Sequence, residues 1–311
     1  MEAQDASSRS HSTVLSRVAA LAQEAGMDYA RFGPHDLLFP HPPLGETRVS
    51  MDPKGEPVLR FYTTHHGLLG FGEIPDLSEF VNDWNHDCLS PRLVLNYASP
   101  EEVEVWGHTF LVVHHTPTAA QLEASVLPAL SNAQAFLEAL VDYFPLLTQV
   151  KRGSALLAAE EESAEDTAST VLPVDVPRLE KLLPALGIIR FQSDSDEVVY
   201  AWINDVLFAF VIESGPSLLI KGHWDPDFPG SEFSKIFLIC NDWNRKNHSA
   251  SAFCHSNMDG LQVRLDYPVI TAAGLSDAQL VTALGRSIKH ILHGIDDIAT
   301  EAVGSSPVQW P

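Results

Sequence analysis

A four-residue sequence, Asn-Asp-Trp-Asn, occurs twice in this chain of 311 residues, at 82–85 and again 159 residues later at 241–244. Apolar residues precede each tryptophan at i, i+3, i+4 and i+7, the spacing of one helix face: Leu77, Phe80, Val81 and Trp84, then Ile236, Ile239, Cys240 and Trp243. The pattern predicts two amphipathic helices that bury Trp84 and Trp243. Asn85 and Asn244 are predicted to end these helices, because asparagine tolerates the left-handed conformation often found there.

Matching helices flank each copy of the motif. Downstream, two capping-box patterns lie 158 residues apart: Thr118 with Gln121, and Ser276 with Gln279. The apolar residues that follow keep one register: Leu122, Val126, Leu130 and Leu137, then Leu280, Leu284, Ile288 and Ile295. Upstream, the helices predicted at 14–25 and 176–186 each precede a glycine, the residue that most often follows a helix. The chain therefore contains one module twice.

Alternating apolar residues and turn signals predict the strands of each module. In the second copy the strands lie at 198–203, 207–212, 218–221, 252–256 and 261–267, with turns at Asn204-Asp205 and Asp259-Gly260. In the first copy they lie at 47–51, 58–62, 68–71, 93–97 and 103–113, with turns at 52–55 and 99–100. A proline-rich stretch at 34–43 is predicted to be a loop. The order α-β-β-β-α-β-β-α with antiparallel hairpins defines an α+β fold.

The length of the chain also indicates two domains. We expect one module at 14–147, a linker at 148–172 and a second module at 173–300. The linker contains five carboxylates within the seven residues from Glu160 to Asp166. Such a sequence buries no core, so it is predicted to be a solvated tether. Docking of a basic partner on the linker is the less favoured alternative.

The formal net charge is −22, from 41 acidic and 19 basic side chains. This balance argues against binding to nucleic acid and to anionic membranes, both of which attract Lys and Arg. The acidity has two interpretations that are equally favoured: it serves solubility alone, or it attracts a basic protein partner. The start lacks the pattern of a signal peptide, and the longest apolar run, 206–212, is too short to span a bilayer. Three cysteines without metal-type spacing fit a reducing cytoplasm.

Residue patterns that carry chemistry are weak in this sequence. The segment from His223 to Asp227 has a histidine and two carboxylates in a predicted pre-helix loop, where an ordinary turn role is favoured over acid–base catalysis. His290, His293 and Asp297 are spaced for one helix face and are predicted to face water rather than to bind a metal. We therefore predict no catalytic, cofactor-binding or metal-binding residue.

Three other patterns also favour a structural role. The adjacent histidines at 65–66 and 114–115 would point to opposite faces of a strand, so neither pair chelates a metal readily. The glycines of 67–72 have the wrong order for a dinucleotide-binding loop. Cys88 follows a histidine and an aspartate, but a single cysteine at a helix end is more often structural than reactive.

Trp84-Asn85 and Trp243-Asn244, each at the end of a helix within this order of elements, resemble the signature of the YbjN family. The family is named for bacterial sensory transduction regulation, and its fold is similar to that of type III secretion chaperones. The resemblance covers about 14–147 and 173–300. It implies a non-enzymatic bacterial regulator, adapter or chaperone-like scaffold without cofactors. It brings no catalytic residues with it.

Secretion chaperones are small acidic dimers, so the resemblance also implies that the two modules associate as a pseudo-dimer within one chain. An unidentified protein partner, which a basic surface would suit, would bind this scaffold. Two alternatives stay open. One is a small-ligand or metal sensor with a pocket between the modules, and the other is an enzyme of unrecognised type.

Overall fold

The computed structural model describes residues 2–32, 36–51, 58–97, 102–113, 117–145, 147–149, 171–213, 217–248, 250–257 and 260–310. Several sequence predictions lie outside these residues: most of the acidic linker (150–170), the histidine pair at 114–115, the turns at 52–55 and 99–100, and Asp259.

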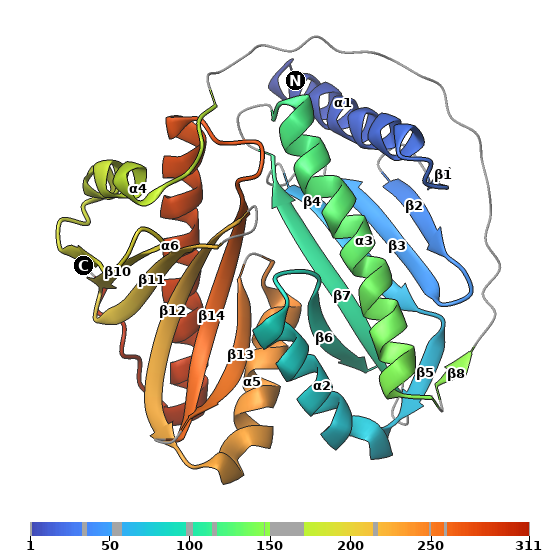
Figure 1. Ribbon diagram of the computed structural model, residues 1–311. Helices are drawn as coiled ribbons and strands as arrows, with labels where there is room; N and C mark the ends of the chain where they lie inside the picture. Colours follow the sequence, from blue (N-terminus) through green and yellow to red (C-terminus); the bar gives the residue numbers. More distant parts are fainter. Residues whose placement is uncertain are drawn as a thin grey trace. The chain divides into compact units, whose positions relative to one another are not determined.

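The chain divides into two compact units (Figure 1). Unit 1 consists of Met1–Ile74 and Ser90–Ala168, and unit 2 consists of Pro75–Leu89 and Ser169–Pro311. The helix that carries Trp84 therefore belongs to unit 2 by its contacts, although the rest of unit 2 comes from the second half of the chain. The units therefore differ from the continuous modules predicted at 14–147 and 173–300.

Unit 1 is an antiparallel sheet with two long helices on one face (Figure 1). The helices are α1 (Glu2–Glu24) and α3 (Ala119–Tyr143). The strands are β1 (Ala30–Arg31), β2 (Asp36–His41), β3 (Gly45–Met51), β4 (Val58–His65), β5 (Gly67–Gly70), β6 (Arg92–Tyr97), β7 (Glu102–Val112) and β8 (Thr148–Gln149), with a 3-10 turn at Phe71–Glu73. Apolar residues of both helices and of β2 to β4 form the core between these layers.

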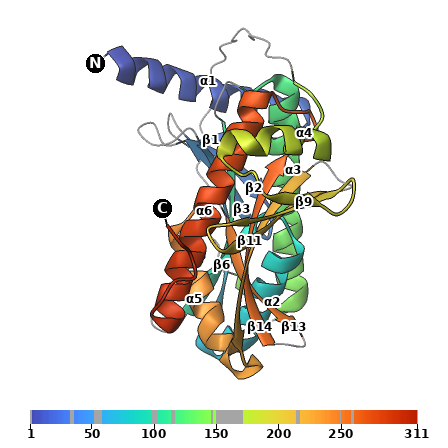
Figure 2. The same ribbon diagram turned by 90° about the vertical axis from the view of Figure 1, so that its left-hand side faces the viewer.

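Unit 2 repeats this arrangement, with α6 and α4 on one face of its sheet (Figures 1 and 2). Its helices are α2 (Ile74–Asp87), α4 (Val176–Leu182), α5 (Phe233–Lys246) and α6 (Asp277–Val303), with 3-10 turns at Leu183–Leu186 and Gly230–Glu232. Its strands are β9 (Phe191–Ser193), β10 (Val198–Ile203), β11 (Val206–Ile212), β12 (Ser217–Phe228), β13 (Ser251–Asn257) and β14 (Gly260–Ile270).

The two sheets share one strand order. In unit 1 the strands run β6-β7-β4-β3-β2-β1, and in unit 2 they run β13-β14-β12-β11-β10-β9, antiparallel throughout. In unit 1, β4 and β5 both pair with β7, whereas in unit 2 the single strand β12 pairs with β14 and shifts register between Trp224 and Phe228. The predicted α+β class with antiparallel sheets is confirmed.

The predicted element order missed four strands: β1, β2, β8 and β9. β1, β8 and β9 have only two, two and three residues, too few to show a periodic pattern, and β8 lies in the predicted linker. β2 was predicted as a loop because of its prolines, yet Leu37 and Phe39 alternate into the core. Pro40 is tolerated because β1 pairs only with Leu37 and Leu38, so Pro40 has no strand on its other side.

Several local signals were predicted correctly: the capping boxes, two helix-ending glycines and one tight turn. Both capping boxes form, at Thr118 and at Ser276. Gly26 and Gly187, which follow the first helix of each half, have φ of +70° and +80°. Asn204 and Asp205 also have positive φ, as the tight turn between β10 and β11 requires.

α3 is long and apolar enough to cross a membrane by length and composition. In the structure its apolar residues are core residues of unit 1, among them Leu122, Val126 and Phe136. The buried core helix of a globular domain has the same composition.

A glycine and a large side chain exchange places between the two units. In unit 2, a Cβ added to Gly294 on α6 would overlap Leu265 Cδ2 and lie 2.7 Å from Trp243 Cζ2. In unit 1 the positions 158 residues earlier are Phe136 and Gly107, and a Cβ added to Gly107 would lie 3.2 Å from Phe136 Cδ1. Each unit therefore fills this part of its core with one large side chain opposite one glycine.

Substituting Gly294 by alanine is expected to lower the free energy of unfolding by about 1–3 kcal/mol, because overpacking outweighs the better helix propensity of alanine. Gly285→Ala on the same helix is the matched control, since its Cβ would lie 3.4 Å from Leu186 Cδ2, an ordinary contact. That variant should be unchanged or more stable by up to about 1 kcal/mol. Urea denaturation followed by circular dichroism measures both, and equal stability of the two variants would refute the packing argument.

Candidate functional site

The two tryptophans of the repeated motif differ in their surroundings. Trp243 is buried in unit 2, and its indole N–H donates to Asp297 Oδ2 at 3.2 Å. Trp84 is half-buried, with its ring centroid 6.2 Å from that of Phe80. The structure therefore places Trp243 in the core, as predicted, and Trp84 only partly so.

The asparagines of the motif lie inside the last turn of their helices. α2 continues to Asp87 and α5 to Lys246, and neither Asn85 nor Asn244 has a positive φ. The prediction that they end the helices in a left-handed conformation is therefore wrong. Their buried amides are available for other contacts instead.

Asn244 pairs with the edge strand of the unit 2 sheet. Its Nδ2 donates to the carbonyl oxygen of Ala252 at 2.8 Å, and the N–H of Ala252 donates to Asn244 Oδ1 at 2.8 Å. Ala252 lies on β13, which has β14 on its other side. The side-chain amide thus offers β13 one donor and one acceptor, as a neighbouring strand would.

Asn82 on α2 makes the same two contacts two residues further along β13. Its Nδ2 donates to the carbonyl oxygen of Cys254 at 3.0 Å, and the N–H of Cys254 donates to Asn82 Oδ1 at 2.8 Å. Both bonds are buried, and they join residues 172 positions apart in sequence. We call Asn82 and Asn244, with their contacts to Ala252 and Cys254, the asparagine clamp.

The asparagine clamp satisfies backbone groups on the outer edge of β13. An unpaired edge strand is a template for pairing with another chain, and a buried unpaired amide costs about 1–3 kcal/mol. Within the described residues, the amides of Asn82 and Asn244 are thus committed to holding β13 rather than free to bind a ligand. The motif in this unit serves the scaffold.

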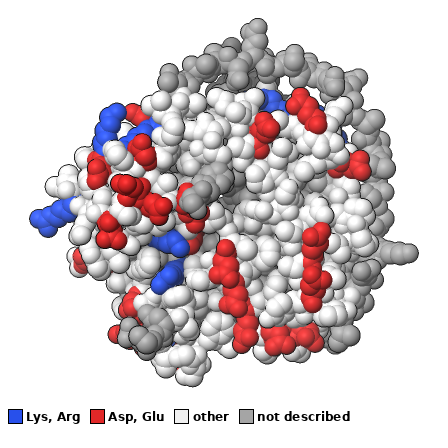
Figure 3. Space-filling view, viewed as in Figure 1, with Lys and Arg blue, Asp and Glu red and all other residues white. Residues whose placement is uncertain are grey.

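Polar side chains gather on the face of the unit 2 sheet opposite α6. The segment around His223, predicted to be a loop before a helix, is instead part of β12, where Lys221, His223 and Asp225 alternate toward this face. Arg264 and Asp266 on β14 lie opposite His223 and Lys221. Lys221 Nζ lies 3.4 Å from Asp266 Oδ2. Figure 3, seen from the same side as Figure 1, shows basic side chains over β12 and β14.

This cluster shifts the pKa of two groups in opposite directions. Burial, followed by the charges of Arg264 and Lys221, lowers the pKa of His223 to about 4. Burial raises the pKa of Asp266 to about 6, although Lys221 and Arg264 oppose the rise. At pH 7 His223 is therefore neutral and Asp266 is mostly ionised. His223 Nε2 and Asp266 Oδ1 are buried without a hydrogen-bond partner among the described residues.

Two further histidines adjoin the cluster. The rings of His86 on α2 and His255 on β13 stack with centroids 5.1 Å apart. Burial and the charge of Arg264 lower the pKa of His255. A histidine and carboxylates do converge here, but on an open sheet face and at unequal depth, so the geometry resembles a packed polar layer more than an acid–base site.

The cluster predicts opposite pH dependences for two variants. A lowered folded pKa means that His223 stabilises the fold above pH 6.5 and that this contribution disappears as the pH falls to about 4. A raised folded pKa means that Asp266 adds stability at low pH, which is lost as the pH rises through about 6. His223→Gln should therefore lose less stability between pH 6.5 and 4 than the unsubstituted protein, by about 2 kcal/mol, and Asp266→Asn should lose more.

Urea titrations at pH 6.5 and 4 measure this difference. The two variants act as controls for each other, because every other titrating group, including His65, is common to both. Parallel pH profiles for the two variants would show that these side chains do not carry the predicted charge states.

The remaining candidates form no reactive site. Burial and then Asp87 raise the pKa of the Cys88 thiol, which keeps it protonated and unreactive. His293 packs beside Trp310 with ring centroids 4.6 Å apart, and Asp297 accepts the hydrogen bond of Trp243. Burial lowers the pKa of His65 to about 4, and its Nδ1 accepts the N–H of Gly67 at 2.6 Å. Across the described residues, no group of three or more His, Cys, Asp or Glu could hold a metal ion.

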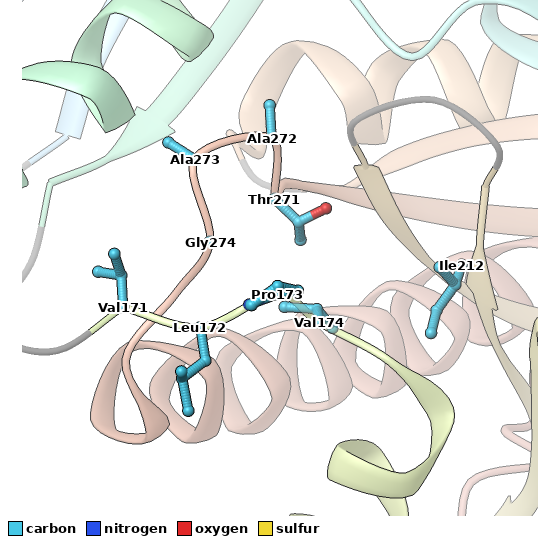
Figure 4. Close-up of a pocket in the computed structure, with 9 residues that line it drawn as sticks. All are labelled: Val171, Leu172, Pro173, Val174, Ile212, Thr271, Ala272, Ala273 and Gly274. Atoms are coloured by element: carbon cyan, nitrogen blue, oxygen red, sulfur yellow. The ribbon is translucent and has the colours of Figure 1, made fainter.

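A shallow depression of about 600 Å³ lies where the chain enters α4 (Figure 4). Residues 171–174, 271–274 and Ile212 line it. Backbone hydrogen bonds between Leu172 and Leu275 join the two segments beside it, and buried Arg178 donates to both of their carbonyl oxygens. Thr271 supplies the one side-chain hydroxyl in an otherwise apolar lining, so the depression holds no group for catalysis.

Comparison with known proteins gives one family. Residues 175–298 match the model of the YbjN family, whose description reads "Putative bacterial sensory transduction regulator". A solved structure, the crystal structure of YbjN from E. coli, described as "a putative transcription regulator", aligns with 44% of this chain and 98% of its own, at 13% identity and a TM-score of 0.36. Curated proteins give no match. The resemblance to YbjN is confirmed for 175–298, and a copy in the first half stays a prediction.

The sequence prediction missed Asn82 and the role of Asn244. Both were visible as identical residues of the two motifs, but the side-chain contacts depend on where β13 lies. The repeat of both asparagines, rather than of the tryptophan alone, was the signal that the amides have a shared task.

Proposed function

We propose that this protein is a non-enzymatic regulator or adapter that acts by binding another protein. The match of 175–298 to a family described as a sensory transduction regulator carries this proposal. The description of this family names a regulator and no enzymatic activity. The contacts of the described residues agree with a non-enzymatic role, because the residues of the Asn-Asp-Trp-Asn motif are used for core packing and for the asparagine clamp.

We propose further that the first half is a second copy of the family domain. The shared strand order, the paired capping boxes and the complementary exchange of Gly294 with Phe136 support this. A chance similarity would not keep the register of helices and strands together. The two copies would form a chaperone-like pseudo-dimer in one chain.

The three cysteines without metal-type spacing fit a cytoplasmic protein, and the acidity of the chain argues against binding to nucleic acid and to anionic membranes. The same acidity favours a partner with a basic surface. The family description supports a regulator, and the charge favours a protein partner over nucleic acid and anionic membranes.

Affinity capture with the purified full-length chain tests the proposed function. A matched control is Gly294→Trp, which should disrupt unit 2 because even a Cβ overlaps its neighbours. We expect a protein that is recovered in stoichiometric amount with the native chain and not with the variant. It should then bind the native chain in calorimetry as a purified protein. If small metabolites or metal ions raise the melting temperature by several degrees and no protein binds, the sensor alternative replaces the proposal.

A further inference from the structure

Two aromatic side chains lie exposed on the face of the unit 2 sheet opposite α6. Tyr200 and Trp202 on β10 are 39% and 68% exposed. Val199, which precedes Tyr200, and Ala201, which lies between the two aromatic residues, face the core. Within the described part of the chain, the indole N–H of Trp202 has no hydrogen-bond partner. A large exposed aromatic side chain is costly to solubility, so a pair of them needs an explanation.

The scaffold does not require these aromatics. The strand pairings place β2 of unit 1 at the same position as β10, 162 residues earlier, where Leu38 and Pro40 stand in place of Tyr200 and Trp202. Leu38 is half-buried and Pro40 is exposed. The aromatic pair is thus a feature of unit 2 and not of the common fold.

Carboxylates flank the aromatic pair at both ends of β10. Asp194, Asp196 and Glu197 lie in the turn before the strand, and Asp205 lies in the turn after it; all four are exposed. Elsewhere several carboxylates pair with Lys or Arg, but among the described residues these four make no salt bridge. Figure 3 shows acidic side chains gathered where β10 and β11 lie in Figure 1.

Exposed aromatic rings and free carboxylates together suit Lys and Arg side chains. A cation over an indole or phenol ring gains about 0.5–2 kcal/mol, and a guanidinium binds a carboxylate through two hydrogen bonds. Tryptophan and tyrosine are also the residues that most often dominate binding energy at protein interfaces. An anionic lipid surface would be repelled by the same carboxylates.

We propose that Tyr200, Trp202 and the carboxylates at 194, 196, 197 and 205 form a docking surface for a Lys- or Arg-rich segment of a protein partner. We call it the β10 surface. This inference rests on the proposed function and specifies the chemistry of the partner. It also assigns the docking to unit 2 alone, because unit 1 lacks the aromatic pair.

Binding of a fluorescein-labelled octa-arginine peptide to the full-length chain, measured by fluorescence anisotropy, tests the β10 surface. Trp202→Ala should weaken binding at least tenfold, and Asp194→Asn with Asp196→Asn should weaken it and reduce its salt dependence. Because these side chains are exposed, the thermal midpoints should not change. The matched control, Glu160→Gln with Glu161→Gln, removes the same charge from the acidic linker and should leave binding unchanged.

Three outcomes would overturn the inference. Equal weakening by the linker control would show attraction to net charge alone. Binding that is unaffected by Trp202→Ala would show that the aromatic pair takes no part. Self-association in analytical ultracentrifugation that Trp202→Ala abolishes would make a second copy of this chain the occupant. A partner that is captured stoichiometrically yet binds Trp202→Ala normally would leave the proposed function intact and remove only the β10 surface.

Discussion

Replacement of Trp243 by alanine is expected to lower the free energy of unfolding by about 3–5 kcal/mol. Trp243 is buried, its ring packs against Gly294, and its indole N–H donates to Asp297. Truncation therefore leaves a cavity and removes a hydrogen bond in the same place. Urea denaturation followed by circular dichroism measures the loss.

Trp84→Ala is the matched comparison, because it changes the equivalent residue of the repeat. Trp84 is half-buried, so we expect about half the loss, roughly 1–3 kcal/mol. Equal losses in the two variants would contradict the difference in burial. A loss below about 1 kcal/mol for Trp243→Ala would show that it is not a core residue.

Substitution of Asn82 by leucine is expected to lower the free energy of unfolding by about 2–5 kcal/mol. Leucine has a similar size but neither donor nor acceptor, so the N–H and carbonyl groups of Cys254 would both be buried without partners. Asn244→Leu should have an effect of similar size through Ala252. The exposed Asp83→Leu, next to Asn82 on α2, controls for a change in helix composition. If Asn82→Leu and Asp83→Leu had equal free energies of unfolding, the hydrogen bonds of Asn82 to β13 would not stabilise the fold.

The sequence predicted the elements whose signals are local. The stripe that ends at Trp243 repeats on one helix face, and the Thr118 and Ser276 capping boxes depend only on residues three positions apart. The turn at Asn204-Asp205 also follows from the residues themselves, because both adopt positive φ there.

Features that depend on distant contacts escaped prediction. Pro40 suggested a loop because proline cannot donate to a neighbouring strand, and only the shortness of β1 reveals that no neighbour is present. Asn85 and Asn244 suggested helix ends because that is the local role of asparagine. The role of Asn82 depends on β13, which is 172 residues away. The same long-range contact explains why α2 belongs to unit 2 rather than to the predicted module at 14–147.

The candidate site also combines local patterns that the sequence shows with an arrangement that depends on long-range contacts. The His223 segment has residues typical of acid–base catalysis, but its strand conformation places His223 and Asp225 in a polar layer on an open sheet face. The aromatic pair at Tyr200 and Trp202 has the alternation of an ordinary strand. Its exposure becomes evident only when the side of the sheet covered by α6 is known.

Residue-resolved hydrogen exchange tests the central claim that the asparagines of the two motifs together hold the edge of β13. In the unsubstituted protein, the amides of Ala252 and Cys254 should both be strongly protected. Asn82→Ala should accelerate exchange at Cys254 more than at Ala252, and Asn244→Ala should do the reverse, because each asparagine accepts one of these two N–H groups. Protection at Cys254 that survives Asn82→Ala would contradict the account.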